Sequence, residues 1–156
     1  MTEFGHVLAD LNEAGVQYVV VGGIAVIGHG VVRATQDVDV VVRPDDETAA
    51  ALERLMGEWR ATRPDGSPEG RDRPARGWPL HLRTTLGLVD VLAEEDPPLD
   101  LAGLLARAQA RTIDGTRAPI CSLADLVALK RRGGRPGDLD DLAKLETAHG
   151  ELPETK

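Results

Sequence analysis

The apolar residues of the first fifteen positions recur with the period of a helix. Phe4, Val7, Leu8 and Leu11 follow the spacing i, i+3, i+4, i+7, and Gly15 is a suitable residue to end such a helix. The segments that follow alternate between short apolar runs of strand length and this helical period. In chain order they predict a strand at 17–21, a turn at Gly22-Gly23 into a short helix, a strand at 33–42 and a helix from Asp45 or Asp46 to Trp59.

The second half of the chain begins with a segment of different character. Residues 62–77 are rich in Pro, Gly and Arg and have almost no apolar content, which predicts a surface loop. The pattern then predicts two strands, a helix, a hairpin with an Asp-Gly turn, and two final helices. These segments are 79–84, 86–94, 99–110, 111–120, 122–133 and a last helix from Pro136 or Asp138.

This order of elements predicts an α+β fold, a small mixed sheet with helices packed on it and a helical C-terminal end. A chain of 156 residues is long enough for one domain with a substantial core. We expect a single domain over residues 1–150, with its core at 15–95, a helical part at 98–149 and a tail at 151–156.

Two aspartates interrupt the apolar strand RATQDVDVVV at 33–42. Asp37 and Asp39 are two residues apart, so strand alternation directs both carboxylates to one face, roughly 7 Å apart. Taken alone, such a pair is more often a solvated rim of the sheet. Like charges this close raise each other's pKa unless a cation offsets them, and carboxylate oxygens are ligands that Mg²⁺ prefers.

A third carboxylate lies in the apolar segment LGLVDVL at 86–92. An unpaired buried carboxylate costs several kcal/mol, so Asp90 is expected to have a partner. If its face is also the face of Asp37 and Asp39, three carboxylates from neighbouring strands converge. Such a set can hold two Mg²⁺ ions about 4 Å apart, an arrangement used in phosphoryl transfer.

The glycines before the short helix match neither common phosphate-binding motif. Gly22-Gly23 is followed by four apolar residues, which excludes GxGxxG, and His29-Gly30 stands where a P-loop that ran from Gly23 to Gly28 needs Lys and Ser/Thr. What remains is a tight turn with bare backbone, where a phosphate can approach the amide groups. Taken alone, the glycines are explained equally well by the turn itself.

Composition and charge narrow the class of protein. The formal net charge of −8 argues against a protein that coats nucleic acid by bulk charge. The arginines of 60–76 form a local basic cluster that either contacts an anionic acceptor such as RNA or belongs to a solvated loop. Cys121 is the only cysteine, and no apolar run reaches the length of a membrane span. We therefore expect a cytoplasmic protein with no membrane partner.

Taken together, these features resemble the nucleotidyltransferase superfamily, the fold of polymerase-beta-like enzymes, antibiotic nucleotidyltransferases and AbiEii-group toxins. The shared features are a Gly-Gly turn after a first strand, a strand with Arg-x-Thr-x-Asp-x-Asp, and a later lone Asp in a strand. The segment SLADLVALKRRGGRPGDLDDLAKLE is similar to the tail of AbiEii-like and related uncharacterised prokaryotic members. The resemblance covers residues 15–45, 80–93 and 120–146.

The resemblance implies a role for each glycine and carboxylate that matches. Gly22 and Gly23 would contact the triphosphate of a nucleotide. Asp37 and Asp39 would bind two Mg²⁺ ions. Asp90 would bind the catalytic ion and accept the proton of the incoming hydroxyl.

It also implies a set of residues around the nucleotide. Arg33 and Thr35 match the polar positions before the aspartate pair, and the forked guanidinium of Arg33 suits a phosphate. Lys130 would reach the nucleotide from the helical end, with Asp138 and Asp141 in support. His29, at a helix end, is by contrast interpreted as a structural residue, and His81, on a strand near Asp90, as a packing residue.

The activity implied is Mg²⁺-dependent transfer of NMP from an NTP to a hydroxyl or phosphate of an RNA, protein or small-molecule acceptor, with release of pyrophosphate. The similarity of the tail implies, more narrowly, the toxin of a toxin–antitoxin pair, with a cognate antitoxin as partner.

Two other hypotheses stay open. One is a domain of this fold that binds a nucleotide or a protein without turnover, which the short chain and Gly137, where such tails often carry Lys, would fit. The other is a structural subunit with a solvated aspartate pair, which would place Asp90 more than about 8 Å from that pair.

Overall fold

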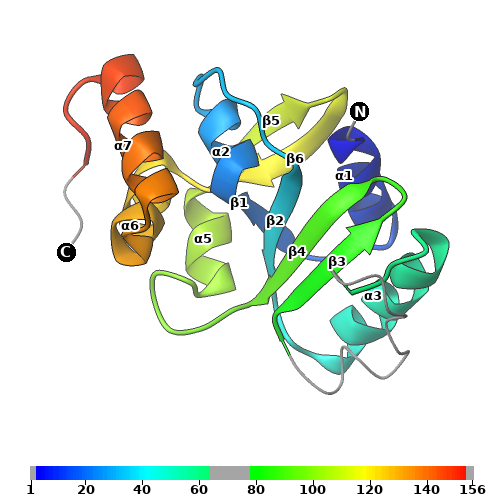
Figure 1. Ribbon diagram of the computed structural model, residues 1–156. Coiled ribbons are helices and arrows are strands. Elements are labelled where there is room, and N and C mark those ends of the chain that lie inside the picture. Colours follow the sequence, from blue (N-terminus) through cyan, green and yellow to red (C-terminus); the bar gives the residue numbers. More distant parts are fainter. Residues whose placement is uncertain (1–2, 64–77, 154–156) are drawn as a thin grey trace.

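A mixed sheet of six strands forms the centre of the molecule, in the order β3-β4-β2-β1-β6-β5 (Figure 1). The computed structural model describes residues 3–63 and 78–153. Pairs β2–β4 and β1–β6 are parallel and the other three neighbouring pairs are antiparallel. The strands are β1 (Tyr18–Val21), β2 (Asp37–Val42), β3 (Leu80–Thr84), β4 (Gly87–Ala93), β5 (Gln109–Ile113) and β6 (Thr116–Ile120).

Helices flank this sheet and make up the C-terminal end, so the predicted α+β fold is confirmed. They are α1 (Phe4–Glu13), α2 (Gly22–Gly28), α3 (Asp46–Glu58), α5 (Leu101–Arg107), α6 (Leu123–Gly133) and α7 (Pro136–His149). None of the helices in the described ranges is long and apolar enough to cross a membrane. The division of the chain into core, helical part and tail stays a prediction.

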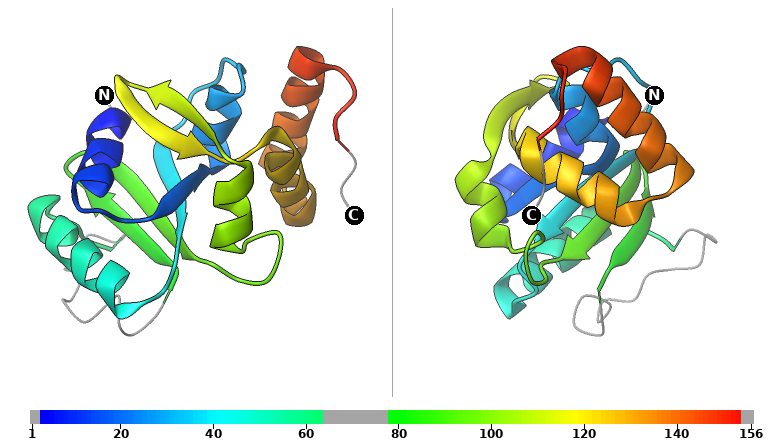
Figure 2. Two further views of the ribbon diagram at one scale, coloured as in Figure 1. Left: turned by 180° about the vertical axis from the view of Figure 1, so that it is seen from behind. Right: turned by 90° about the vertical axis from the view of Figure 1, so that its left-hand side faces the viewer.

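The two faces of the sheet are covered differently. On one face, valines such as Val38, Val40 and Val91 are fully buried, and α1 and α3 lie together against this side (Figure 2). A hydrogen bond from Trp59 Nε1, next to the end of α3, to Asp10 of α1 joins the two helices at 2.8 Å. On the opposite face α2 lies over β1 and β2, while β3 and β4 are left open toward the viewer (Figure 1). This side of β3 and β4 is therefore free to carry polar side chains.

Most of the predicted elements are present, with shifted ends. Strand β2 begins at Asp37 and not at Arg33, because residues 31–36 have no regular structure. The helix predicted at 99–110 ends at Arg107, where Ala108 has an extended backbone and the chain enters β5. Pairing of β5 with β6 overrides the helical period of those last residues.

The predicted loop at 62–77 falls mostly outside the described residues. So do three arginines of the basic cluster, Arg71, Arg73 and Arg76. Its first residue, Thr62, forms an isolated antiparallel bridge with Arg83 of β3. The start of the segment is thus attached to the edge strand of the sheet.

The predicted hairpin turn at Asp114-Gly115 is confirmed, and it yields a stability prediction. Both residues have positive φ, 48° and 81°, as the favoured two-residue hairpin turn requires. Gly115→Ala is expected to destabilise the protein by about 1 kcal/mol, because an L-residue is strained at this φ although space is open. Gly57→Ala, in α3 and also with open space around it, is the matched control and should be neutral or stabilising by up to about 1 kcal/mol. Urea unfolding measures both, and equal effects of the two substitutions would contradict this account of the turn.

Candidate active site

Three aspartates converge on the open face of the sheet. Asp39 of β2 and Asp90 of β4 are direct partners in the parallel register, and Asp37 lies two residues before Asp39 on the same face. One carboxylate oxygen from each residue lies within 4.8 Å of those from the other two. This distance is well inside the limit of about 8 Å beyond which shared cations become unfeasible. The hypothesis of a structural subunit expected Asp90 to lie farther than this limit from the aspartate pair, and that separation is not found.

The three carboxylates are partly buried, and their environment disfavours negative charge. Burial, a hydrogen bond with Asp90 and the charges of Asp90 and Asp37 raise the pKa of Asp39 to about 7, against a weaker opposite effect of Lys130. Burial and then the charge of Asp90 also raise the pKa of Asp37, with Arg33 acting in the opposite direction. The cluster holds more negative charge than its surroundings offset.

Asp90 is less deeply buried than its apolar segment indicates. Its side chain is 24% exposed, since β4 has only the edge strand β3 beyond it and none of the helices in the described ranges lies over β4 on this face. The expectation of a partner is confirmed, because Asp39 and His81 both lie against it.

The donor set fits a hard divalent cation. All three groups offer oxygen, the atoms lie close enough to share an ion, and a cation would offset their mutual repulsion. Carboxylate oxygen without sulfur or nitrogen favours Mg²⁺, Mn²⁺ or Ca²⁺ over zinc. Asp37, Asp39 and Asp90 are the described residues that could hold such an ion.

Cation binding at this cluster is expected to depend on pH. A cation competes with the proton of Asp39, so Mg²⁺ affinity should rise as pH increases to about 7 and level off above it. Because the pKa of Asp39 is raised on folding from 3.8, the metal-free protein keeps a proton that the unfolded chain loses. Its stability should therefore fall as pH rises from about 4 through about 7. Calorimetric titrations with Mg²⁺ and melting temperatures in chelator, both measured at several pH values, check this; a pH-independent affinity would contradict it.

The Gly22-Gly23 turn packs directly against this cluster. Gly22 has a φ of +69°, and a Cβ at this position would collide with the Asp39 carboxylate. A Cβ on Gly23 would lie 2.8 Å from Thr35 Oγ1 and 3.4 Å from Arg33 Nη1. The glycines therefore do more than form a turn, because they let the residues of the Arg-x-Thr-x-Asp-x-Asp segment approach the backbone at the start of α2.

Ion pairs join Arg33 and Lys130, the two positively charged side chains of the site, to α7. Arg33 Nη1 donates to both oxygens of Asp141, at 2.8 and 2.7 Å. Lys130 Nζ lies 2.8 Å from Asp141 Oδ2 and 3.3 Å from Asp138 Oδ1. Asp138 and Asp141 are almost fully buried. Although burial acts to raise it, hydrogen bonds from Arg135 and Lys130 hold the pKa of Asp138 below its ordinary value.

The structure thus brings together all ten residues that the resemblance singles out. Lys130 forms ion pairs with the two buried aspartates, and their role in supporting this lysine at a nucleotide stays a prediction. The link from Arg33 to Asp141 was not predicted, since the two residues are 108 positions apart in the chain. Contacts with a nucleotide stay predictions for Gly22, Gly23, Arg33, Thr35 and Lys130.

Two histidines test the sequence interpretation in opposite ways. His29 is buried and its Nε2 lies 2.7 Å from the carbonyl oxygen of Cys121, which agrees with its interpretation as a structural residue. The same interpretation is wrong for His81, whose side chain is 57% exposed and whose Nδ1 lies 2.7 Å from Asp90 Oδ1. The alternation of buried Leu80 and Leu82 around it was the available signal that His81 faces outward.

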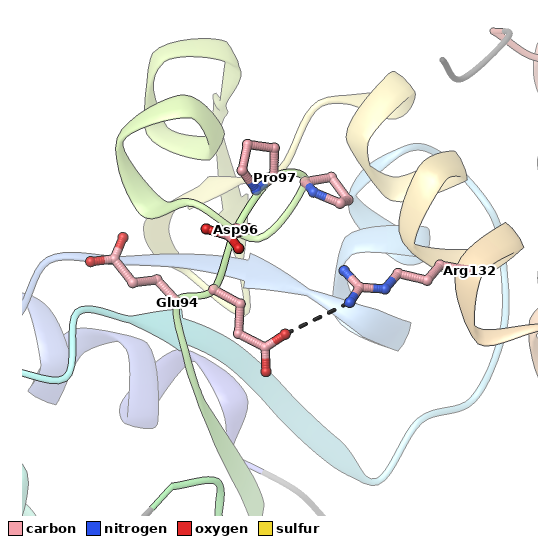
Figure 3. A pocket seen from close by; sticks show the side chains of 6 residues that line it. Glu94, Asp96, Pro97 and Arg132 are labelled. Carbon is pink, nitrogen blue, oxygen red and sulfur yellow. Dashed lines mark ion pairs between the residues drawn. The ribbon is translucent and has the colours of Figure 1, made fainter.

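A separate hollow of about 810 Å³ lies beyond the end of β4 (Figure 3). It is lined by the acidic and proline residues of the β4–α5 connection and by Arg132 of α6. Arg132 Nη2 lies 3.7 Å from Glu95 Oε2. None of the residues assigned to the candidate site lines this hollow.

No protein-family model matches the sequence, and no curated protein matches it either. Solved structures do match the fold. The lincosamide antibiotic adenylyltransferase LnuA, with lincomycin bound, has a TM-score of 0.64 and 14% identity over 94% of this chain and 96% of that chain. An antigenic nucleotidyltransferase-like protein from Paracoccidioides brasiliensis has a TM-score of 0.61 and 19% identity over 94% of this chain and 75% of that chain. The antibiotic-resistance factor ANT(2'')-Ia has a TM-score of 0.60 and 14% identity over 92% and 80%.

These proteins share an architecture with this chain at low sequence identity, and their names agree with the family that the Gly-Gly turn and the Asp-x-Asp strand resemble. The chain has the nucleotidyltransferase fold.

Proposed function

We propose that this protein is a Mg²⁺-dependent nucleotidyltransferase that moves NMP from an NTP to a hydroxyl of an acceptor and releases pyrophosphate. The observation that carries the proposal is the convergence of three carboxylates on two parallel strands, within 4.8 Å of one another. Partial burial is a poor arrangement for three carboxylates in the absence of a cation, because Arg33 and Lys130 offset only part of their mutual repulsion. A cation site explains it.

Asp37 and Asp39 would hold two Mg²⁺ ions, and Asp90 would share the one nearer the acceptor. When bound, the ions would offset negative charge on the entering and leaving oxygens of an in-line displacement at the α-phosphorus. Asp90 lies on the side of the edge strand and is the most suitable of the three to receive the proton of an incoming hydroxyl.

The triphosphate would lie on the side of the aspartates that is away from the edge strand β3. The positive charges of the site are there, with Arg33 against Gly23 and Lys130 close enough to influence Asp39. Arg33 uses Nη1 for its bonds to Asp141 and makes no bond through Nη2 to the described residues, which leaves that nitrogen for a phosphate oxygen. Backbone amides at Gly22 and Gly23 and the hydroxyl of Thr35 would complete the contacts.

Three classes of acceptor stay open, namely small molecules, RNA and proteins. The antibiotic adenylyltransferase and the antibiotic-resistance factor of the same fold favour testing small hydroxylated molecules first. A toxin with a cognate antitoxin is a narrower hypothesis that rests on the resemblance of the C-terminal tail. Cytoplasmic location also stays a prediction.

Incubation with Mg²⁺ and each NTP labelled at the α-phosphate, together with total RNA, cell proteins and hydroxylated antibiotics, tests the proposal. We expect one acceptor to be labelled, with pyrophosphate released, and no label with Asp37→Ala/Asp39→Ala. Asp140→Asn is the matched control, because this aspartate is 69% exposed and lies outside the site. Calorimetry that finds no NTP binding, or equal binding by the double variant, would contradict the proposal. Binding without pyrophosphate release across all acceptors would favour the non-catalytic alternative.

A further inference from the structure

His81 stands directly beside the candidate metal site. It lies on β3, the edge strand of the sheet, and is the direct partner of Asp90 in the antiparallel register. Leu80 and Leu82 point into the core, so alternation turns His81 onto the face that carries the three carboxylates. Opposed residues of an antiparallel pair have Cβ atoms about 4.5–5.5 Å apart, close enough for their side chains to meet.

The contact between the two side chains is short and specific. His81 Nδ1 lies 2.7 Å from Asp90 Oδ1, a distance typical of a charge-assisted hydrogen bond. The histidine side chain is 57% exposed, so packing does not hold the ring in place and the bond to Asp90 orients it. Among the described residues, no other side chain outside the three aspartates makes a hydrogen bond to Asp90.

Asp90 needs such a restraint more than its two neighbours do. Asp39 is held against Gly22, whereas Asp90 stands next to the edge strand. Repulsion by Asp37 and Asp39 favours a rotation of the Asp90 carboxylate away from the cluster when no cation is bound. A donor on the far side of Asp90 would keep it in place.

We propose that His81 is a positioning residue, which holds the Asp90 carboxylate in the orientation that binds the cation. With Nδ1–H donating to Oδ1, the second oxygen of Asp90 stays available as a ligand. Partners of this kind behind a metal ligand typically contribute about 10–100-fold to metal affinity or activity. The inference rests on the proposed function, because that function assigns Asp90 to the metal site.

The direct test is Mn²⁺ binding to the protein without nucleotide, followed by electron paramagnetic resonance at one fixed pH. His81→Ala and His81→Phe are expected to weaken binding by about 10-fold or more. His81→Asn should restore it to within about 3-fold, because its amide nitrogen takes the place of Nδ1 as a donor to Asp90. The Phe variant keeps a ring at this position, which separates loss of the donor from loss of bulk.

His6→Ala is the matched control. His6 is 58% exposed and its Nε2 lies 3.7 Å from Asp10 Oδ1, but both residues belong to α1, which contributes none of the three aspartates. Its Mn²⁺ affinity should equal that of the native protein. Melting temperatures confirm that each variant is folded.

Nucleotide transfer provides an independent readout. With an acceptor in hand, His81→Ala should lower kcat about 10-fold and leave the KM for NTP within about 2-fold, because the triphosphate contacts lie on the other side of the aspartates. Native Mn²⁺ affinity in both His81→Ala and His81→Phe would overturn the inference. A protein that binds Mn²⁺ but transfers nothing would contradict the proposed function alone, and weaker binding in His81→Ala would still support the role of His81. Absence of Mn²⁺ binding by the native protein would overturn both.

Discussion

Asp39→Asn is expected to abolish NMP transfer and at the same time to stabilise the metal-free protein. The substitution removes the central carboxylate of the three, so Mg²⁺ loses a shared ligand and transfer should fall by on the order of 10³-fold or more. Without metal, however, the charge on Asp39 opposes folding, since burial and two neighbouring carboxylates raise its pKa to about 7. Removing this charge should raise the free energy of unfolding above pH 7 by about 2 kcal/mol.

Melting curves in chelator and in Mg²⁺ separate the two effects. In chelator at about pH 8, Asp39→Asn should melt about 5 °C above the native protein. Mg²⁺ should raise the melting temperature of the native protein and leave that of the variant unchanged. Asp37→Asn should stabilise less, because Asp37 is less buried than Asp39. A lower melting temperature of Asp39→Asn in chelator would contradict the view that the charge of Asp39 serves metal binding and lowers the stability of the metal-free protein.

Asp141→Ala is expected to have the opposite effect, a loss of about 3 kcal/mol of stability. Asp141 is 4% exposed, accepts hydrogen bonds from Arg33 and forms an ion pair with Lys130. Removing it leaves two cations without their shared partner, one of them a lysine whose side chain is only 11% exposed. Breaking a buried ion pair in this way typically costs about 3–5 kcal/mol, far more than the loss of an exposed pair.

Urea unfolding of Asp141→Ala and of the neighbouring Asp140→Ala measures this difference. Asp140 pairs with Lys144 at 3.3 Å on the exposed side of the same helix, so its loss should change stability by no more than about 0.5 kcal/mol. Both substitutions place the same residue in α7, which cancels their effects on helix propensity. Equal stability of the two variants would contradict the role of Asp141.

Asp141→Ala should also affect the candidate active site, through Arg33. Asp141 connects α7 to the segment before β2, which has no regular structure of its own and carries Arg33 and Thr35. Loss of the pair frees this segment and removes the restraint on the guanidinium. We therefore expect Asp141→Ala to raise the KM for NTP as well as to lower stability.

The polar residues of the site could be recognised in the sequence because each departs from its local pattern. Asp37, Asp39 and Asp90 interrupt apolar strands, and Gly22-Gly23 interrupts an apolar segment without matching either common phosphate-binding motif. Strand alternation has a period of two residues, so it determines that Asp37 and Asp39 share a face. It does not determine which strands are neighbours, and the meeting of Asp39 with Asp90 depended on the parallel pairing of β2 with β4.

The residues that sequence reasoning misjudged depend on long-range contacts. His81 was interpreted as a packing residue, although its alternation with Leu80 and Leu82 indicates that it faces outward. That it faces Asp90 depends on the pairing of β3 with β4. The extent of β5 was underestimated because its backbone pairs with β6 where the side chains favour a helix. The turn at Asp114-Gly115, in contrast, was predicted correctly, since positive φ at both positions is a local preference of these residue types.

By itself the sequence determined the elements, the turn chemistry and the identity of the charged groups, all of which depend on neighbours within a few positions. Only the tertiary structure decided that a lysine of α6 and an arginine before β2 share the buried carboxylate of Asp141, and that His81 lies behind Asp90. Strand order and helix docking set these distances, and they follow from burial of the whole core and not from any single segment. The three aspartates combine both kinds of information. The spacing of Asp37 and Asp39 can be seen in the sequence, whereas their convergence with Asp90 depends on the tertiary structure.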